Sequence, residues 1–328
     1  MMRRGVGICA TVLVLCGAAV MAVSLPEAGA QEFPNRAIRL LVGFPAGGPS
    51  DVPARIVADK MQKALGQPVV VENKTGAAGM IALNEMLAQP RDGHTLLLCS
   101  YLDVSNTLLY RSVAYKLEDI APVSMVSKAY YAFTVPTSLP VKDMAEFIAY
   151  AKERPGKLNY GKVGAGSVTE LLAKQLEKVA GISMVGVPFK GTGPALQEVV
   201  AGRLELTVSP LVLALPQHEG GQVKILGLTS MERLAVAPNV PTLVEQKVPI
   251  ASYGWWGMCA ASGTPRPVID KLNAVVAAAV GSPDYRSAME KGGTVAVSST
   301  PEQLGSIVDE TVKEFRDLIA GLGIKQLE

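Results

Sequence analysis

The residues best suited to bind a ligand occupy positions 43–51, where the sequence reads GFPAGGPSD. An apolar run at 38–42 precedes them and predicts a buried strand. Residues 52–65 follow with apolar side chains at helical spacing, which predicts a helix. Paired glycines allow a tight turn, and Ser50 or Asp51 is suited to cap the helix.

The first turn of such a helix favours an anion, because its N–H groups and the helix dipole are positive there. Two interpretations stay open: the turn binds a carboxylate, or it only connects two elements tightly. The candidate binding residues in this stretch are Phe44, Ala46, Gly47, Gly48, Ser50 and Asp51.

The same device occurs again immediately downstream. A valine run at 69–71 predicts a strand, a small-residue loop follows, and residues 80–87 predict a helix. Two such loops at the carboxyl edge of a parallel sheet would line one crevice. A third strand, 95–100, should bring Tyr101 and Asp103 to the same edge as weaker candidates. The binding candidates of the second loop are Gly76, Ala77, Ala78 and Gly79.

The middle of the chain has its own glycine-and-hydroxyl loop before a helix predicted at 170–179. Lys162 and Lys190 could each add a positive charge for a second carboxylate, although Lys190 also fits a solvated turn. The candidates from this half are Lys162, Gly164, Gly166, Ser167, Thr169 and Lys190.

The order of the elements predicts an α/β protein with two lobes. Strands at 123–126 and 131–135 lead out of the first lobe, and the strand containing Trp255 and Trp256 returns to it. We expect lobe 1 to comprise 31–130 and 253–328, and lobe 2 to comprise 131–252. A strand alternates its faces, so one tryptophan should be core and the other is free to line a pocket. Helices are predicted at 143–152, 265–280 and 301–322.

Residues 1–30 have the pattern of a cleaved signal peptide, although a membrane anchor is the alternative. Arg3 and Arg4 precede an apolar stretch, and the small residues at 28–30 predict cleavage after Ala30. We therefore expect a periplasmic protein. Removing two arginines and Glu27 lowers the formal net charge from +2 to +1, which gives no indication of a nucleic-acid partner.

Enzymatic and metal-binding patterns are weak. The two histidines, His94 and His218, lack metal-ligand spacing, and no Gly-x-Ser-x-Gly elbow is present. We expect no catalytic residues, no metal and no cofactor, with an Asp51–Glu170 carboxylate pair as the weaker enzymatic interpretation.

Two cysteines remain in the exported chain, Cys99 and Cys259, and each ends an apolar run. An oxidising compartment permits a disulfide between them. The apolar surroundings favour buried free thiols instead.

Several short motifs together carry a resemblance that covers nearly all of the exported chain. They are FPAGG at 44–48 with Asp51, NKTGAAG at 73–79, PRDGHTLL at 90–97, PGKLNYG at 155–161, PFKG at 188–191, VPT at 240–242 and WG at 256–257. With these motifs in family order, the chain resembles the periplasmic solute receptors of tripartite tricarboxylate transporters, the Bug family.

The resemblance implies a type II, flytrap-like periplasmic-binding-protein fold, each lobe a doubly wound sheet flanked by helices. It implies that loops 44–51 and 76–79 hold a carboxylate through backbone amides and water, with loop 164–169 facing them. Lys162 and Glu170 depart from the family's usual small hydroxyl residue and histidine, which leaves the ligand's identity open.

The implied partners are a small mono- or dicarboxylic acid and the membrane subunits of the transporter, with the receptor as a monomer. An alternative keeps the fold but delivers its signal to a membrane sensor, and a secreted hydrolase is more distant.

Overall fold

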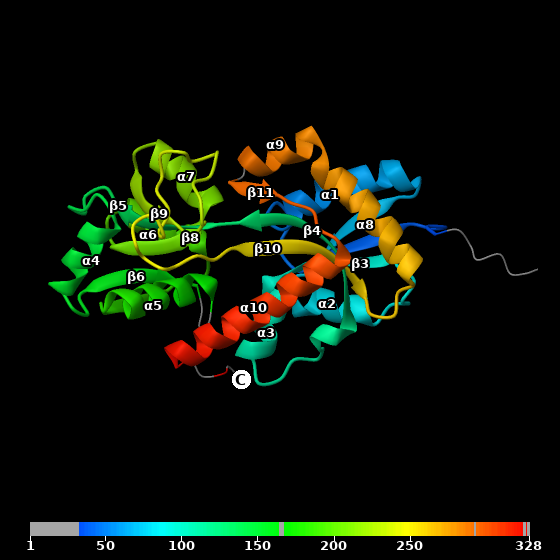
Figure 1. Ribbon diagram of the computed structural model, residues 1–328, viewed down its shortest axis with the longest axis horizontal. Coiled ribbons are helices and arrows are strands. Elements are labelled where there is room, and N and C mark those ends of the chain that lie inside the picture. The colour runs from blue at the N-terminus through cyan, green and yellow to red at the C-terminus, as the bar shows by residue number, and fades with distance from the viewer. Residues whose placement is uncertain (1–32, 164–166, 292, 324–325, 327–328) are drawn as a thin grey trace, which may run out of the picture. The chain divides into compact units, whose positions relative to one another are not determined.

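The computed structural model describes residues 33–163, 167–291, 293–323 and 326 (Figure 1). The predicted signal peptide and the loop residues Gly164 and Gly166 therefore lie outside the described part. Pro34–Glu328 forms one compact unit. Within the described ranges, no helix combines the length and the apolar character needed to cross a bilayer.

The first sheet contains the strands of both ends of the chain, in the order β11-β4-β10-β3-β1-β2. Strands β1, β2 and β3 are parallel, so their carboxyl ends share one edge, whereas β10 is antiparallel to β3 and β4. The bounds are β1 Ile38–Val42, β2 Val69–Asn73, β3 Thr95–Ser100, β4 Ile120–Ala129, β10 Gly254–Ala261 and β11 Thr294–Ala296.

The second sheet contains the middle of the chain, in the order β7-β6-β8-β5-β9. Strands β6, β7 and β8 are parallel, and β5 is antiparallel to both β8 and β9. The bounds are β5 Tyr131–Pro136, β6 Leu158–Lys162, β7 Met184–Pro188, β8 Leu206–Pro210 and β9 Val223–Leu228.

Helices cover both faces of each sheet, as a doubly wound arrangement requires (Figure 1). Alternation along β5 shows the reason: Phe133 packs into the core beneath α4 and α5, and Ala132 packs beneath α7. The bounds are α1 Asp51–Leu65, α2 Met80–Leu87, α3 Tyr101–Leu109, α4 Met144–Lys152, α5 Val168–Ala180, α6 Thr192–Val200, α7 Leu211–Glu219, α8 Arg266–Gly281, α9 Pro283–Lys291 and α10 Pro301–Leu322, with short 3-10 turns at Ala77–Gly79 and Leu117–Asp119.

The sequence-based assignment missed α3, α7, α9 and β11. Helix α3 begins directly after β3 without a glycine or proline between them. Ser100 supplies the start signal instead, because its hydroxyl accepts the Leu102 N–H while the Asp103 carboxylate accepts the Ser100 N–H, a reciprocal cap.

The two segments that join the sheets lie beside each other. β4 leads through Tyr130 into β5, and the chain returns through Tyr253 into β10. The rings of these two tyrosines lie 6.2 Å apart, and the Lys128 ammonium sits 4.3 Å above the Tyr253 ring. Because the two aromatic rings pack against each other, side-chain contacts hold the two connecting segments together.

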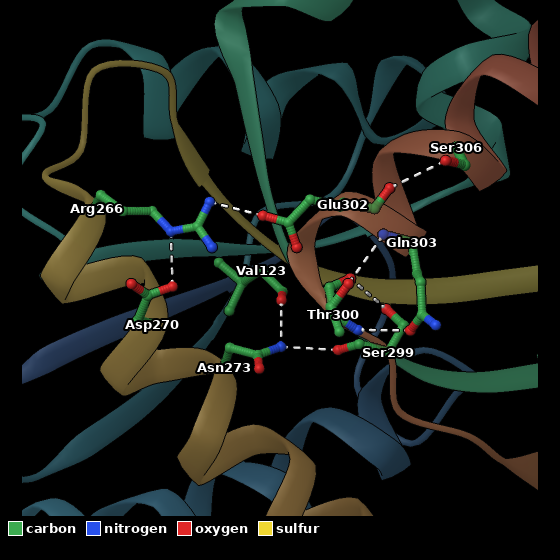
Figure 2. Close-up of polar contacts among 9 residues, drawn as sticks. All are labelled: Val123, Arg266, Asp270, Asn273, Ser299, Thr300, Glu302, Gln303 and Ser306. Atoms are coloured by element: carbon green, nitrogen blue, oxygen red, sulfur yellow. Dashed lines mark hydrogen bonds and ion pairs between the residues drawn. The ribbon is translucent and has the colours of Figure 1, made fainter.

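The last helix, α10, starts on the first sheet and ends on the second. Thr300 caps it, and at its start Glu302 pairs with Arg266 of α8 (Figure 2). Its early residue Leu304 lies in the core of the first sheet, and Phe315 lies in the core of the second. The helix therefore packs on both lobes, a question that the sequence left open.

Figure 2 also shows how the segment before α10 is fixed. Asn273 of α8 donates through its side-chain nitrogen to the carbonyl oxygens of Val123 and Ser299, at 2.7 Å each. The start of α10 is thereby tied to both α8 and β4.

The preference for free thiols is wrong: Cys99 and Cys259 form a disulfide. They lie on the neighbouring antiparallel strands β3 and β10, with Cα atoms 5.8 Å apart, within the range a disulfide needs. The sequence showed two apolar runs but not that the runs pair, so the proximity of the sulfurs could not be foreseen.

The disulfide joins residues separated by 160 positions and should restrict the unfolded chain strongly. We expect a Cys99→Ala/Cys259→Ala variant to lose roughly 2–5 kcal/mol of unfolding free energy. Urea unfolding of the two proteins measures this. Titration of two free thiols in the denatured, unreduced wild type would contradict the assignment.

Candidate functional site

The two glycine-rich loops of the first lobe lie against each other. The backbone at Gly43 approaches Gly79 so closely that a Cβ on Gly43 would lie 2.7 Å from the Gly79 Cα atom. The Asn73 side chain donates to the Phe44 carbonyl oxygen at 2.9 Å. Glycine is required at position 43 because any side chain would separate the loops.

A buried carboxylate holds the first loop in shape. Asp51 is 2% exposed and accepts hydrogen bonds from the Gly47 N–H, the Arg55 guanidinium and the Asn73 amide, at 2.7–2.9 Å. Burial alone would raise the pKa of this carboxyl, but the bonds from Arg55, Gly47 and Asn73 hold the pKa below its usual value. Asp51 is therefore an anion at the α1 N-terminus supplied by the chain itself.

The expected helix cap is absent at this end of α1. Ser50 precedes the helix but makes no side-chain cap, and its hydroxyl accepts the Trp256 indole N–H at 2.8 Å instead. Asp51 bonds backward to Gly47, which has φ +77°. The predicted capping role is wrong for both residues, because each is used to fasten the loop rather than the helix.

The second loop has an unusual backbone. Gly76, Ala77, Ala78 and Gly79 all have positive φ, at 129°, 45°, 52° and 93°. Two consecutive alanines in this region are costly and persist only where surrounding structure enforces them. Successive N–H groups in such conformations form a concavity suited to anions.

Helix α3 supports the strained loop from beneath. The buried Asn106 side chain donates to the Ala78 carbonyl oxygen at 3.2 Å. The Asp103 Oδ1 atom would lie 3.9 Å from a Cβ on Gly79. Asp103, predicted as a weak ligand contact, is a buried part of the α3 cap beside this loop.

Several amides of the two loops have no hydrogen-bond partner in the part of the chain that the structure describes. Among the described residues, none accepts a hydrogen bond from the backbone N–H of Ala46, Ser50, Ala77 or Ala78. By contrast, the Gly47 N–H is occupied by Asp51, and the Gly48 N–H points to the Pro45 carbonyl at 3.4 Å. The first-lobe candidates thus separate into amides that shape the loop and amides without a partner among the described residues, here called open amides.

The two tryptophans of β10 point to opposite faces of the sheet, as strand alternation predicts. Trp255 is 2% exposed and donates its indole N–H to Thr311 of α10 at 3.0 Å. Trp256 points to the opposite face, where it is only partly buried and contacts Ser50 of the first loop. Trp256 is therefore the tryptophan that belongs to the loop region.

The second-lobe candidates surround the start of α5. The Ser167 hydroxyl caps this helix by accepting the Glu170 N–H at 3.3 Å, and it lies 3.1 Å from the Thr169 hydroxyl. Lys162 at the end of β6 forms an ion pair with Glu170 at 2.6 Å. Lys190 is exposed on the turn before α6.

The structure gathers the described candidates of each lobe into a group of their own. Apposition of loops 44–51 and 76–79 with loop 164–169 stays a prediction, as does the assignment of individual residues to ligand binding. Asp51 and Glu170, suggested as a carboxylate pair for an enzyme, are each bonded to a cation of their own lobe.

Metal-binding geometry is also lacking in the part of the chain that the structure describes. No three His, Cys, Asp or Glu side chains there could hold an ion together. His94 lies 3.2 Å from Asp92, and His218 contacts the Val223 carbonyl at the far end of α7.

Comparison with known proteins identifies the family. The model of the tripartite tricarboxylate transporter family receptor matches residues 53–324. The chain belongs to this receptor family. BugT of Bordetella pertussis is 31% identical over 318 residues, which cover 94% of this chain and 97% of BugT. A Cupriavidus necator relative is 32% identical over 305 residues, covering 92% of each.

Solved structures of receptors agree in fold. A protein of R. palustris with adipate has a TM-score of 0.80 at 30% identity and covers 90% of this chain and 100% of its own. MatC from Rhodopseudomonas palustris, with bound malate, has a TM-score of 0.75 at 32% identity, with coverage of 88% and 100%. The two-lobed periplasmic-binding-protein fold expected from the sequence is confirmed.

The positive φ angles of loop 76–79 lead to a prediction about stability. Ala77 is exposed, so Ala77→Gly should relieve its positive φ without removing packing and should leave the unfolding free energy unchanged or higher by up to about 1 kcal/mol. Ala149 is exposed inside α4, where the same change should cost about 1 kcal/mol. Equal losses in both variants by urea unfolding would contradict the strain.

A second prediction concerns pH. Burial raises the pKa of Asp103 to about 7, against the lowering effect of its bonds from Ser100. The pKa of Asp103 in the folded protein exceeds its unfolded value of about 3.9. Asp103 therefore contributes its full stabilisation below a pH of about 3.9, and this contribution falls as the pH rises toward 7.

Asp103→Asn should therefore gain stability relative to wild type between pH 4 and 7, by at most about 1.4 kcal/mol per pH unit. Urea unfolding across this range tests the slope. A difference between the two proteins that is constant with pH would contradict the raised pKa.

Proposed function

We propose that this chain is a periplasmic receptor that binds one small organic carboxylate between its lobes and delivers it to the membrane subunits of a tripartite tricarboxylate transporter. The observation that carries the proposal is the set of open amides on two touching loops, at Ala46, Ser50, Ala77 and Ala78. Amides arranged around positive-φ residues suit a carboxylate.

The energetics are adequate without an arginine. A hydrogen bond to a charged group contributes about 1.5–3 kcal/mol net. Four such bonds sum to about 6–12 kcal/mol, and water bridges add to this sum. Micromolar binding needs roughly 8 kcal/mol after the cost of ordering and closure is subtracted. Since the loops are already fixed by Asp51 and Asn106, little of that gain is lost in ordering them.

The remaining parts of the proposal follow from this role. Export by a signal peptide cleaved near Ala30 would place the receptor in the periplasm. We propose that lobe 2 comprises 131–252; the passage of the chain between the two sheets beside Tyr130 and Tyr253 supports these boundaries. We propose action as a monomer, without a catalytic step, on a mono- or dicarboxylic acid.

Gly47 offers the sharpest test. Its φ is +77°, so Gly47→Val should distort the first loop and weaken acid binding at least a hundredfold. The measurement is a titration by calorimetry with the acid, among butyrate, hexanoate, malate, succinate and adipate, that raises the melting temperature most.

Gly66→Val is the matched control. Gly66 has φ +68° at the other end of α1, and at both glycines a new Cβ would meet nothing within 4 Å. Both variants should therefore lose a similar stability, while only Gly47→Val loses binding. Retained affinity in Gly47→Val, or equal loss in both, would exclude the first loop as the carboxylate site.

A further inference from the structure

The second lobe carries a charge arrangement that bears on which acids fit. Lys162 ends β6, and its side chain runs along the sheet toward α5. Gly186 on β7 makes room for it, because a Cβ there would lie 3.0 Å from the Lys162 Cδ atom. The position of the ammonium is therefore set by packing as well as by charge.

The ammonium is committed to a partner of the same lobe. Its Nζ atom lies 2.6 Å from Oε1 of Glu170, whose side chain is only 6% exposed. Separating them would leave a buried carboxylate without its cation, which is strongly unfavourable. Lys162, 24% exposed, is thus held by Glu170 rather than free to move to a ligand.

Glu170 also occupies the place where an anion would otherwise bind. It lies in the first turn of the 13-residue helix α5, where the helix dipole favours negative charge, and Ser167 already caps its N–H. A ligand carboxylate approaching this corner would meet an ammonium whose charge Glu170 already neutralises, so it would lose hydration without gaining an available cation. An uncharged group would meet no such penalty.

From these contacts we propose that the Lys162–Glu170 ion pair restricts the receptor to acids with a single carboxylate and an uncharged far end. This inference rests on the proposed function, since it assumes that the first-lobe loops hold the one carboxylate. Lys190 does not reverse it, because its ammonium lies on an exposed turn, where solvent weakens its attraction.

The test compares acids of equal length that differ by one carboxylate: butyrate with succinate, and hexanoate with adipate. Calorimetry at pH 7.5 keeps every carboxyl ionised. In the wild type, we expect the monoacid of a pair to bind at least tenfold more tightly. In Glu170→Gln, which frees the Lys162 charge while keeping the shape, the diacid should gain at least tenfold relative to the monoacid.

Glu198→Gln is the matched control. Glu198 is also paired with a cation of the second lobe, Arg203, but this pair precedes β8 and so lies at the opposite edge of the sheet from Lys162. The variant changes the net charge equally and should leave the monoacid-to-diacid ratio within twofold of wild type.

The outcomes separate the two proposals. Wild-type preference for the diacids, or an unchanged ratio in folded Glu170→Gln, overturns the inference and leaves the carboxylate receptor intact. Equal shifts in both variants overturn it too, because net charge would explain them. If Glu170→Gln does not fold, the wild-type ratio decides alone, and a wild type that binds no acid of the panel overturns the proposed function itself.

Discussion

The first lobe depends on one buried carboxylate. Asp51 receives hydrogen bonds from a loop amide, a helix guanidinium and a strand-end amide, so it joins β1, α1 and β2 at a single point. A carboxylate buried this deeply is tolerated only because each bond comes from a fixed donor. The loop between β1 and α1 is consequently shaped before any ligand arrives.

Both lobes have the same charge arrangement at the proposed site. At α1 and α5 alike, the chain places its own carboxylate in the first helical turn and pairs it with a neighbouring cation, Arg55 or Lys162. In the proposed binding mode, the chain's own carboxylates occupy both helix starts, which leaves the loop amides, including those of Ala77 and Ala78, for the ligand. Preorganised amides bind without a further ordering cost.

Much of the fold could be predicted from the sequence, because strong local signals mark it. The apolar run of β1 and the proline-led start of α10 are confirmed at the predicted residues. Helix α3 could not be predicted in this way, because it follows β3 directly. Only the Ser100 cap, which is also the last residue of that strand, marks its start. The disulfide depends on pairing of β3 with β10, which no local pattern encodes.

The candidate site was predictable in part. Small residues at 76–79 indicated an unusual loop, but positive φ at the two alanines follows from tertiary contacts such as the Asn106 bond to Ala78. Asp51 was suited to a cap by residue type, yet its bonds are set by Asn73 and Arg55. The Lys162–Glu170 pair joins a strand end to a helix start eight residues later, a proximity that no local sequence pattern encodes.

The proposed binding mode relies on fixed backbone amides of the two first-lobe loops to hold the acid. Its most direct measurement is a nitrogen-15 amide NMR titration with the acid that stabilises the protein most. We expect the largest shifts at the amides of Ala46, Ser50, Ala77 and Ala78, with smaller shifts at Ser167 and Thr169. Saturating binding that leaves the four first-lobe amides unshifted would contradict the account.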